Sequence, residues 1–210
     1  MASRISEFPV PTAWYDRLMV WASVWESWEG VPVAIGTLKD WDRIRAQLGA
    51  AFRILAQHSP ADFERLRTLT RGVVVARLWG SNAEWRRSLR VCVLSTEYLR
   101  ESGASAAAVA ATIVHEVMHA RLDAHGFEYD KNRGRIELIC YAASKHFLNK
   151  LPQSSDRDAA LKDVEKRLRI ESAIWDRTHE ITRNAMPRPL RALAFVLRWV
   201  TPGRRRRTPA

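Results

Sequence analysis

Residues 114–125 read V-H-E-V-M-H-A-R-L-D-A-H, and this stretch decides how the rest of the chain is interpreted. It contains the pattern HExxH at His115, Glu116 and His119. Two His four residues apart lie on one face of an α-helix, so both rings can bind one metal ion. The Glu after the first His then lies where its carboxylate can take a proton from a water on that metal. The pattern therefore predicts a zinc site held by His115 and His119, with Glu116 as the general base.

The residues before this pattern predict that its helix is buried. The run from Ala104 to Val114 is rich in Ala and Val and contains no charged residue. A helix that is apolar on all sides is typically surrounded by protein. Gly126 follows His125, at the position where helices commonly end. A pair of surface His on an ordinary helix remains the alternative interpretation.

A third metal ligand must come from outside the pattern, and two residues compete for this role. His125 follows His119 by six residues, which matches the metzincin spacing HExxHxxGxxH, but Leu122 stands where that pattern has Gly. If the helix continues through Leu122, His125 lies about 9 Å along the axis from His119. Residues so far apart cannot share one ion, because bonds to zinc are only about 2 Å long. We therefore favour Glu137 over His125, without excluding His125.

Glu137 lies near the start of a helix predicted from about Arg133 to Lys150. The loop before it, residues 127–132, is long enough for this helix to fold back antiparallel against the HExxH helix. An early residue of the second helix would then lie beside the two His. Glu137 shares a side of its helix with Cys140 and Tyr141. A solvent-exposed Glu in an Arg-rich helix start is the other interpretation of this residue.

With these residues the chain resembles the gluzincin class of zinc metallopeptidases, whose HExxH helix is followed by a Glu ligand on a second helix. The resemblance covers about residues 106–151 and rests on His115, Glu116, His119 and Glu137. The run HARL…GFEYD…RGRIELIC also resembles small bacterial proteins of unassigned activity that carry HExxH. The resemblance implies a hydrolase that holds one Zn²⁺ per chain and acts on peptide or protein substrates.

The same resemblance implies further details of the site. Many gluzincins have an Asp one turn after the Glu ligand to orient a His, whereas this chain has Tyr141 there. The family places a β-strand beside the active-site helix, and Val91–Leu94 is the strand expected to pair with an extended substrate. The oxyanion would be stabilised by the metal and by one further donor, for which the candidates are Tyr129, Tyr141, His146 and His179.

The remaining patterns predict an α+β fold that is predominantly helical. Besides the two helices at the site, helices are expected over about 38–57, 60–69 and 156–182. Two short β-branched runs, Gly72–Leu78 and Leu89–Leu94, predict strands separated by the turn residues 80–82. We expect these strands to form a short antiparallel hairpin before the HExxH helix, in a zincin-like domain.

Tryptophan is concentrated near the N-terminus. Trp14, Leu18, Trp21, Trp25 and Trp28 follow one another at steps of three or four residues. This spacing predicts an amphipathic helix that ends at Gly30. Such a helix either packs on the core, which we favour, or lies in a membrane interface.

The positive charge is concentrated at the C-terminus. The chain carries a formal net charge of +11, but residues 181–210 contain eight Arg and no acidic residue. They account for +8, which leaves 11 − 8 = +3 for the first 180 residues. A nucleic-acid groove across the domain is therefore not expected, and nucleic acid is an unlikely partner for the tail because no aromatic residue interrupts its Arg run.

The segment 189–200 is apolar apart from Arg191 and Arg198, and four Arg follow at 204–207. A helix of that length spans only about 18 Å, too short to cross a bilayer. It would either lie on an anionic membrane surface or dock on protein. We expect a Trp-rich segment at 1–36, a metallopeptidase domain at 37–182 and a basic segment at 183–210.

Cys92 and Cys140 are too few for a disulfide scaffold, and no signal peptide is evident. A cytoplasmic protein, with contact to the membrane periphery through its Arg tail, is therefore expected. The alternative to a peptidase is a non-catalytic helical protein that binds a membrane surface and carries a degenerate or structural zinc site.

Overall fold

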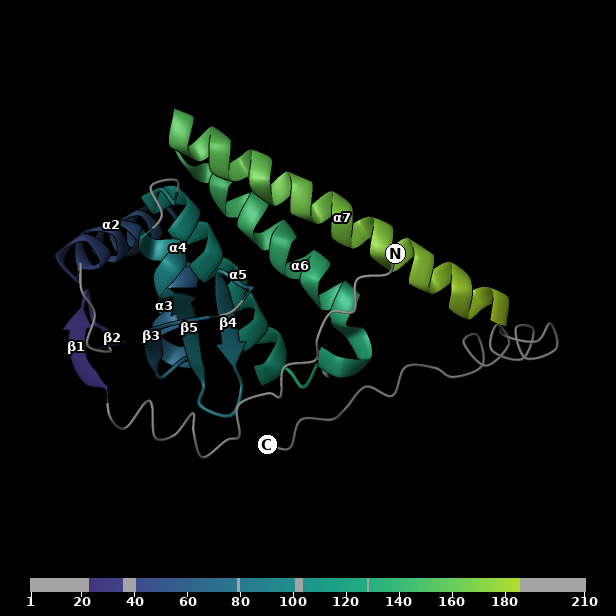
Figure 1. Ribbon diagram of the computed structural model, residues 1–210, viewed down its shortest axis with the longest axis horizontal. Coiled ribbons are helices and arrows are strands. Elements are labelled where there is room, and N and C mark those ends of the chain that lie inside the picture. Colours follow the sequence, from purple (N-terminus) through teal and green to yellow (C-terminus); the bar gives the residue numbers. More distant parts are fainter. Residues whose placement is uncertain (1–22, 36–40, 79, 101–103, 128, 186–210) are drawn as a thin grey trace, which may run out of the picture.

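The computed structural model describes residues 23–35, 41–78, 80–100, 104–127 and 129–185. Helices predominate, and one small sheet accompanies them (Figure 1). In chain order the elements are β1 (Val24–Trp28), β2 (Val31–Ile35), α2 (Trp41–His58), α3 (Pro60–Leu69), β3 (Gly72–Ala76), β4 (Ala83–Arg86), β5 (Val91–Ser95), α4 (Thr96–Arg100), α5 (Ala106–Ala124), α6 (Tyr129–Lys150) and α7 (Ser155–Ala185). The predicted α+β class with a helical majority is confirmed.

The sheet is mixed, with the strand order β1-β2-β3-β5-β4. β1 pairs with β2 and β4 pairs with β5 in antiparallel fashion, whereas β2–β3 and β3–β5 are parallel. The prediction of an antiparallel pair formed by the segments at 72–78 and 89–94 is therefore wrong. The antiparallel hairpin that precedes the HExxH helix is instead formed by β4 and β5.

The pairing of β3 with β5 is parallel because β4 intervenes in the sequence. After β3 the chain crosses to the sheet edge as β4, reverses through residues 87–90, and returns between β3 and β4 as β5. Arg90 adopts a positive φ of 55° in this reversal. The segment at 83–86 reads A-E-W-R and is only half-buried, so it lacks the apolar run by which β3 and β5 were found.

The predicted Trp-rich helix is also wrong over the residues that the structure describes. Trp25 and Trp28 belong to β1, which forms a hairpin with β2 through Glu29 and Gly30. Both turn residues have positive φ, 50° and 75°, as a two-residue type I′ loop requires. Trp14, Leu18 and Trp21 lie outside the described residues.

One face of the sheet carries the main core. Alternate strand residues such as Val73, Val75, Cys92 and Leu94 point into a cluster with apolar side chains of α2, α3, α5, α6 and α7. The residues between them, such as Val74 and Val93, join a smaller cluster on the opposite face. This alternation is the period of two that a strand imposes. The helices therefore cover one side of the sheet, with α5 against both sheet and helices.

The helix boundaries follow their sequence signals closely. Ser105 caps α5, and its Oγ accepts a hydrogen bond of 3.2 Å from the Ala108 N–H. Gly126 follows the same helix with a φ of 77°, as predicted. Helix α6 begins at Tyr129, four residues before the predicted start, and it ends at Lys150 as predicted.

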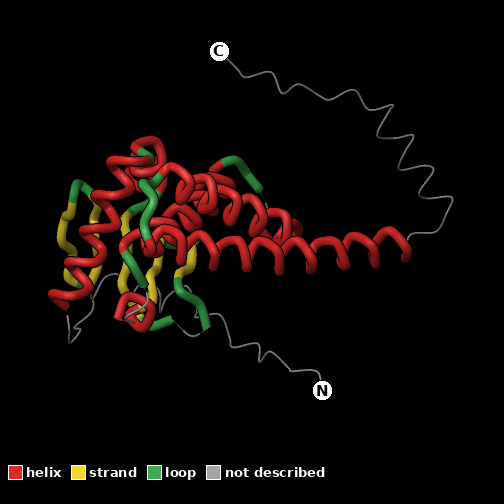
Figure 2. Tube along the Cα trace, turned by 90° about the horizontal axis from the view of Figure 1, so that it is seen from above, coloured by secondary structure: helices red, strands yellow, loops and turns green. Residues whose placement is uncertain are grey.

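Helix α7 runs along α6 and extends beyond the rest of the described chain (Figure 2). Among the described helices, none is both long and apolar enough to cross a membrane. The apolar segment 189–200 and the Arg tail lie outside the described residues.

Candidate metal centre

The two His of the pattern meet on one face of α5. Both side chains are about one-tenth exposed, and their Nε2 atoms lie 3.1 Å apart. The helix holds them in this position because its other faces are buried, as the apolar run predicts. Glu116 follows His115 on a different face and is 5% exposed. The three residues of the pattern are thus inside the protein, and the surface interpretation is wrong.

Helix α6 brings Glu137 to the two His. The Oε2 atom of Glu137 lies 3.2 Å from His115 Nε2, and Oε1 lies 3.5 Å from His119 Nε2. Seven residues further along α6, the Ser144 hydroxyl donates a hydrogen bond of 2.9 Å to the Ala111 carbonyl, one turn before His115. Later residues of α6 therefore contact earlier residues of α5. This is the antiparallel packing expected from the loop length.

The spacing of these atoms fits a tetrahedral metal ion. Nitrogen and oxygen ligands about 2.0–2.1 Å from a tetrahedral zinc lie about 3.3 Å from one another. The two Nε2 atoms lie 3.1 Å apart, and each faces a different oxygen of Glu137, Oε2 at 3.2 Å from His115 and Oε1 at 3.5 Å from His119. Each of these separations is close to that between two ligands of one zinc ion, and the donor types suit zinc.

The charges at this face also suit a cation. Burial, with a smaller contribution from the neighbouring His115, lowers the pKa of His119 to about 4, so its ring is neutral at pH 7. Burial alone would raise the pKa of Glu137, but hydrogen bonds from His115 and Tyr129 and the nearby imidazoles bring it down to about 2. An ionised carboxylate and a neutral imidazole are the protonation states that bind metal.

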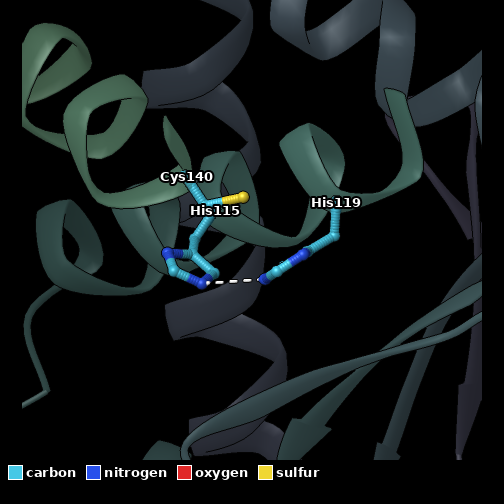
Figure 3. A group of neighbouring side chains, drawn as sticks. All are labelled: His115, His119 and Cys140. Carbon is cyan, nitrogen blue, oxygen red and sulfur yellow. Dashed lines mark hydrogen bonds between the residues drawn. The ribbon is translucent and has the colours of Figure 1, made fainter. Parts of the chain in front are cut away.

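Cys140 is a member of the same cluster that the sequence did not assign to the site. The side-chain donor atoms of His115, His119 and Cys140 all lie within 4.8 Å of one another (Figure 3). Cys140 is fully buried, and burial, with Glu137 and Glu116 nearby, raises the pKa of its thiol well above the ordinary range. These three side chains form a group that could hold a metal ion. The sequence signal that could have placed Cys140 at the site is its spacing of three residues from Glu137, which puts both side chains on one face of the helix.

Glu116 occupies a drier position than Glu137. Burial raises its pKa to about 7, with a further upward effect of Glu137 and Glu84, against opposing effects of the electrostatic influence of His115 and a hydrogen bond from the Trp85 backbone. Trp85 belongs to β4, which contacts α5. The carboxyl group of Glu116 therefore lies between the HExxH helix and the edge strand, with a pKa close to neutral.

His115 has no partner for its second ring nitrogen among the described residues. Its Nδ1 atom is buried and makes no hydrogen bond. Tyr141, which stands where the resemblance would place an Asp, packs its ring on His115 at a centroid distance of 4.4 Å. The two rings are tilted at 57° to each other, so Tyr141 gives His115 a ring contact at the position where the resemblance would place a carboxylate.

Of the other candidate residues, Tyr129 contacts Glu137, whereas His125 and His146 do not contact the cluster. His125 ends α5 as an exposed residue, and its Nδ1 contacts the Arg121 carbonyl at 2.7 Å. Tyr129 donates a hydrogen bond of 2.6 Å to Glu137 Oε1. His146 is exposed on α6 and does not line the cavity at the site. The side chain of His179 is outside the described part of the chain.

A cavity of about 1590 Å³ opens over the cluster. Its walls come from β4 and the loops on either side, from α5 and α6, and from the first half of α7. His115, Glu116, His119 and Glu137 all line it. This volume exceeds the ~300–1,000 Å³ of typical small-ligand pockets and leaves room for an extended chain.

The strand beside this cavity is β4, and the expectation that Val91–Leu94 would pair with a substrate is corrected. That segment lies in β5, which is paired on one side with β3 and on the other with β4. Among the strands that the structure describes, β4 has one neighbour, β5, so its second side is the free edge of this sheet.

Comparisons with protein-family models, curated proteins and solved structures return no match for this chain.

Proposed function

We propose that this protein is a zinc-dependent peptide hydrolase with His115, His119 and Glu137 as metal ligands. The observation that carries the proposal is the close approach of their donor atoms: 3.1 Å between the two imidazole Nε2 atoms, and 3.2 and 3.5 Å from these to the two oxygens of Glu137, with all three residues lining a large cavity. A zinc ion bound there would act as the Lewis acid that polarises the scissile carbonyl and acidifies the attacking water.

Glu116 would be the general base. It neighbours His115 on the same helix, lines the same cavity, and has a pKa near 7. A group with such a pKa can accept the proton of the attacking water and then return it to the leaving amine. A carboxylate with the pKa of Glu137, about 2, would be a poor proton donor at neutral pH. The two carboxylates therefore suit different roles.

The free edge of β4 supports a peptide as the substrate class. An extended peptide can add to an exposed strand edge through main-chain hydrogen bonds, with its side chains in alternate pockets. Residues 83–86 line the cavity that contains the metal-binding cluster. A peptide aligned with this strand would cross the space in front of Glu116, whose carboxyl group already meets the Trp85 backbone.

The test is hydrolysis of a mixture of internally quenched peptides by the zinc-loaded full chain and by Glu116→Gln. We expect wild type to cleave and Glu116→Gln to bind the same amount of zinc but to lose ~10²–10⁴-fold in rate, the usual contribution of a general base. Equal rates in the two proteins would remove Glu116 from the mechanism. A zinc-loaded wild type that cleaves nothing would contradict the proposed function.

A further inference from the structure

Helix α6 presents two metal-binding side chains to the His pair. Glu137 and Cys140 lie three residues apart, hence on one face of the helix, and both approach His115 and His119. The open site of the proposed function, on which this inference rests, uses only the carboxylate. The thiol belongs to the same cluster, and the proposed hydrolysis has no role for it.

The position of the Cys140 sulfur requires only a small change for metal binding. Sulfur about 2.3 Å from a tetrahedral zinc and nitrogen about 2.0–2.1 Å from it lie about 3.6 Å from each other. The Cys140 Sγ atom, one ring nitrogen of His115 and one ring nitrogen of His119 lie within 4.8 Å of one another. Closing this gap takes a shift of about 1 Å, less than the difference between two side-chain rotamers.

The balance of charge favours a thiolate at this position. Cys140 is fully buried and is not among the residues that line the cavity. The carboxylate of Glu137 and a thiolate at Cys140 together supply two negative charges, which neutralise a divalent cation between neutral imidazoles. A buried cation without such compensation is costly. A coordinating thiol is deprotonated by the ion itself.

We propose that Cys140 is a fourth, displaceable ligand that closes the metal site in the resting protein. When the sulfur–metal bond forms, the thiol proton leaves to solvent, and four protein ligands then leave no position for water. When that bond breaks, the sulfur regains a proton and the fourth position opens. A site with four protein ligands is the structural type of zinc site, whereas one with an open position is the catalytic type.

The test is zinc-edge X-ray absorption of the zinc-loaded full chain, with Cys140→Ala and Cys92→Ala beside it. Cys92 is the matched control, because it is also fully buried and lies near Glu116 but belongs to no metal-binding group among the described residues. We expect one sulfur neighbour at about 2.3 Å in wild type and in Cys92→Ala, and only nitrogen and oxygen neighbours at about 2.0–2.1 Å in Cys140→Ala.

The spectrum of wild type is decisive even if Cys140→Ala fails to fold. A wild-type spectrum without sulfur overturns the inference, as does a sulfur shell that is lost in Cys92→Ala. Hydrolysis by Cys140→Ala should be at least as fast as by wild type, since its fourth position is always open.

Glu137→Ala separates this inference from the proposed function. A wild-type spectrum without sulfur, together with zinc lost in Glu137→Ala, would reject Cys140 and keep the open site. A sulfur shell with zinc retained in Glu137→Ala would keep Cys140 and reject Glu137 as a necessary ligand. A wild-type chain that binds no zinc would reject both.

Discussion

Two carboxylates lie at the candidate site, and their surroundings shift their pKa values in opposite directions. Glu116, between α5 and β4, is held in a dry position that raises its pKa to about 7. Glu137, on the α6 side of the cavity, meets two imidazoles and the Tyr129 hydroxyl, which lower its pKa to about 2 despite its burial. One residue type thus has two protonation behaviours within a single cavity.

This difference indicates which carboxylate suits which task. A carboxylate that remains ionised under all ordinary conditions is suited to hold a cation, whereas one that titrates near neutrality is suited to exchange a proton. The contrast arises from packing. Burial dominates at Glu116, whereas the hydrogen bonds and imidazoles around Glu137 outweigh its burial. Variants at both positions can therefore test whether the contrast is real.

The largest expected effect comes from removing one of the imidazoles that face Glu137. His119→Ala should reduce bound zinc from about one per chain to none and abolish hydrolysis, because a catalytic zinc site keeps three protein ligands. The measurement is metal content by plasma mass spectrometry after dialysis. His146→Ala, at an exposed His on α6, is the control and should keep its zinc. Full zinc content in His119→Ala would show that the ligand assignment is wrong.

The contrast between the two carboxylates can be tested by measuring the free energy of unfolding against pH in the metal-free protein. Between pH 4.5 and about 7, Glu116 is ionised in the unfolded chain but protonated in the folded one, so wild type loses up to about 3 kcal/mol from this group as pH rises. Glu116→Gln escapes that loss and should gain stability relative to wild type over this range.

Glu137→Gln should show the opposite dependence. The folded-state pKa of Glu137 lies below its unfolded value, so its contribution to stability is complete above pH 4.5 and is lost as pH falls towards 2. The variant should therefore be less stable than wild type at neutral pH and should approach it in acid. Denaturant titrations of the three proteins with a chelator present measure both trends. Parallel trends for the two variants would refute the contrast.

A smaller effect is expected from the hydroxyl that orients Glu137. Tyr129→Phe keeps the ring but removes the hydrogen bond of 2.6 Å to Oε1. Loss of such an outer partner typically weakens metal binding by ~10–100-fold. Competition with a zinc chelator measures the affinity, and Tyr98→Phe, whose hydroxyl contacts Thr112 at 3.2 Å, serves as the matched control. Equal affinities in the two variants would leave Tyr129 without a role at the metal.

Much of the helical framework was predictable because its signals are local. The apolar run before His115, the stop at Gly126 and the Pro that follows Ser59 each mark an element from neighbouring residues alone. The His pair was likewise predictable, since a spacing of four has a direct geometrical consequence on a helix. The approach of Glu137 followed from the length of one loop.

The errors concern features that depend on distant partners. Trp25 and Trp28 have helical spacing, yet they form the strand β1. This strand pairs with β2, and β2 in turn pairs with β3. The edge strand β4 has a polar sequence and is recognised only by its pairing with β5. The sequence did not assign Cys140 to the site, because the position of a thiol in the sequence does not reveal which side chains it faces.

The most direct test of the ligand assignment is the zinc content of wild type beside Glu137→Ala and His125→Ala. We expect about one zinc per chain in wild type and in His125→Ala, and none in Glu137→Ala, because His125 is exposed at the end of α5 while Glu137 faces both imidazoles. Zinc that is retained in Glu137→Ala and lost in His125→Ala would contradict the site described above and would require a break in α5 near Leu122.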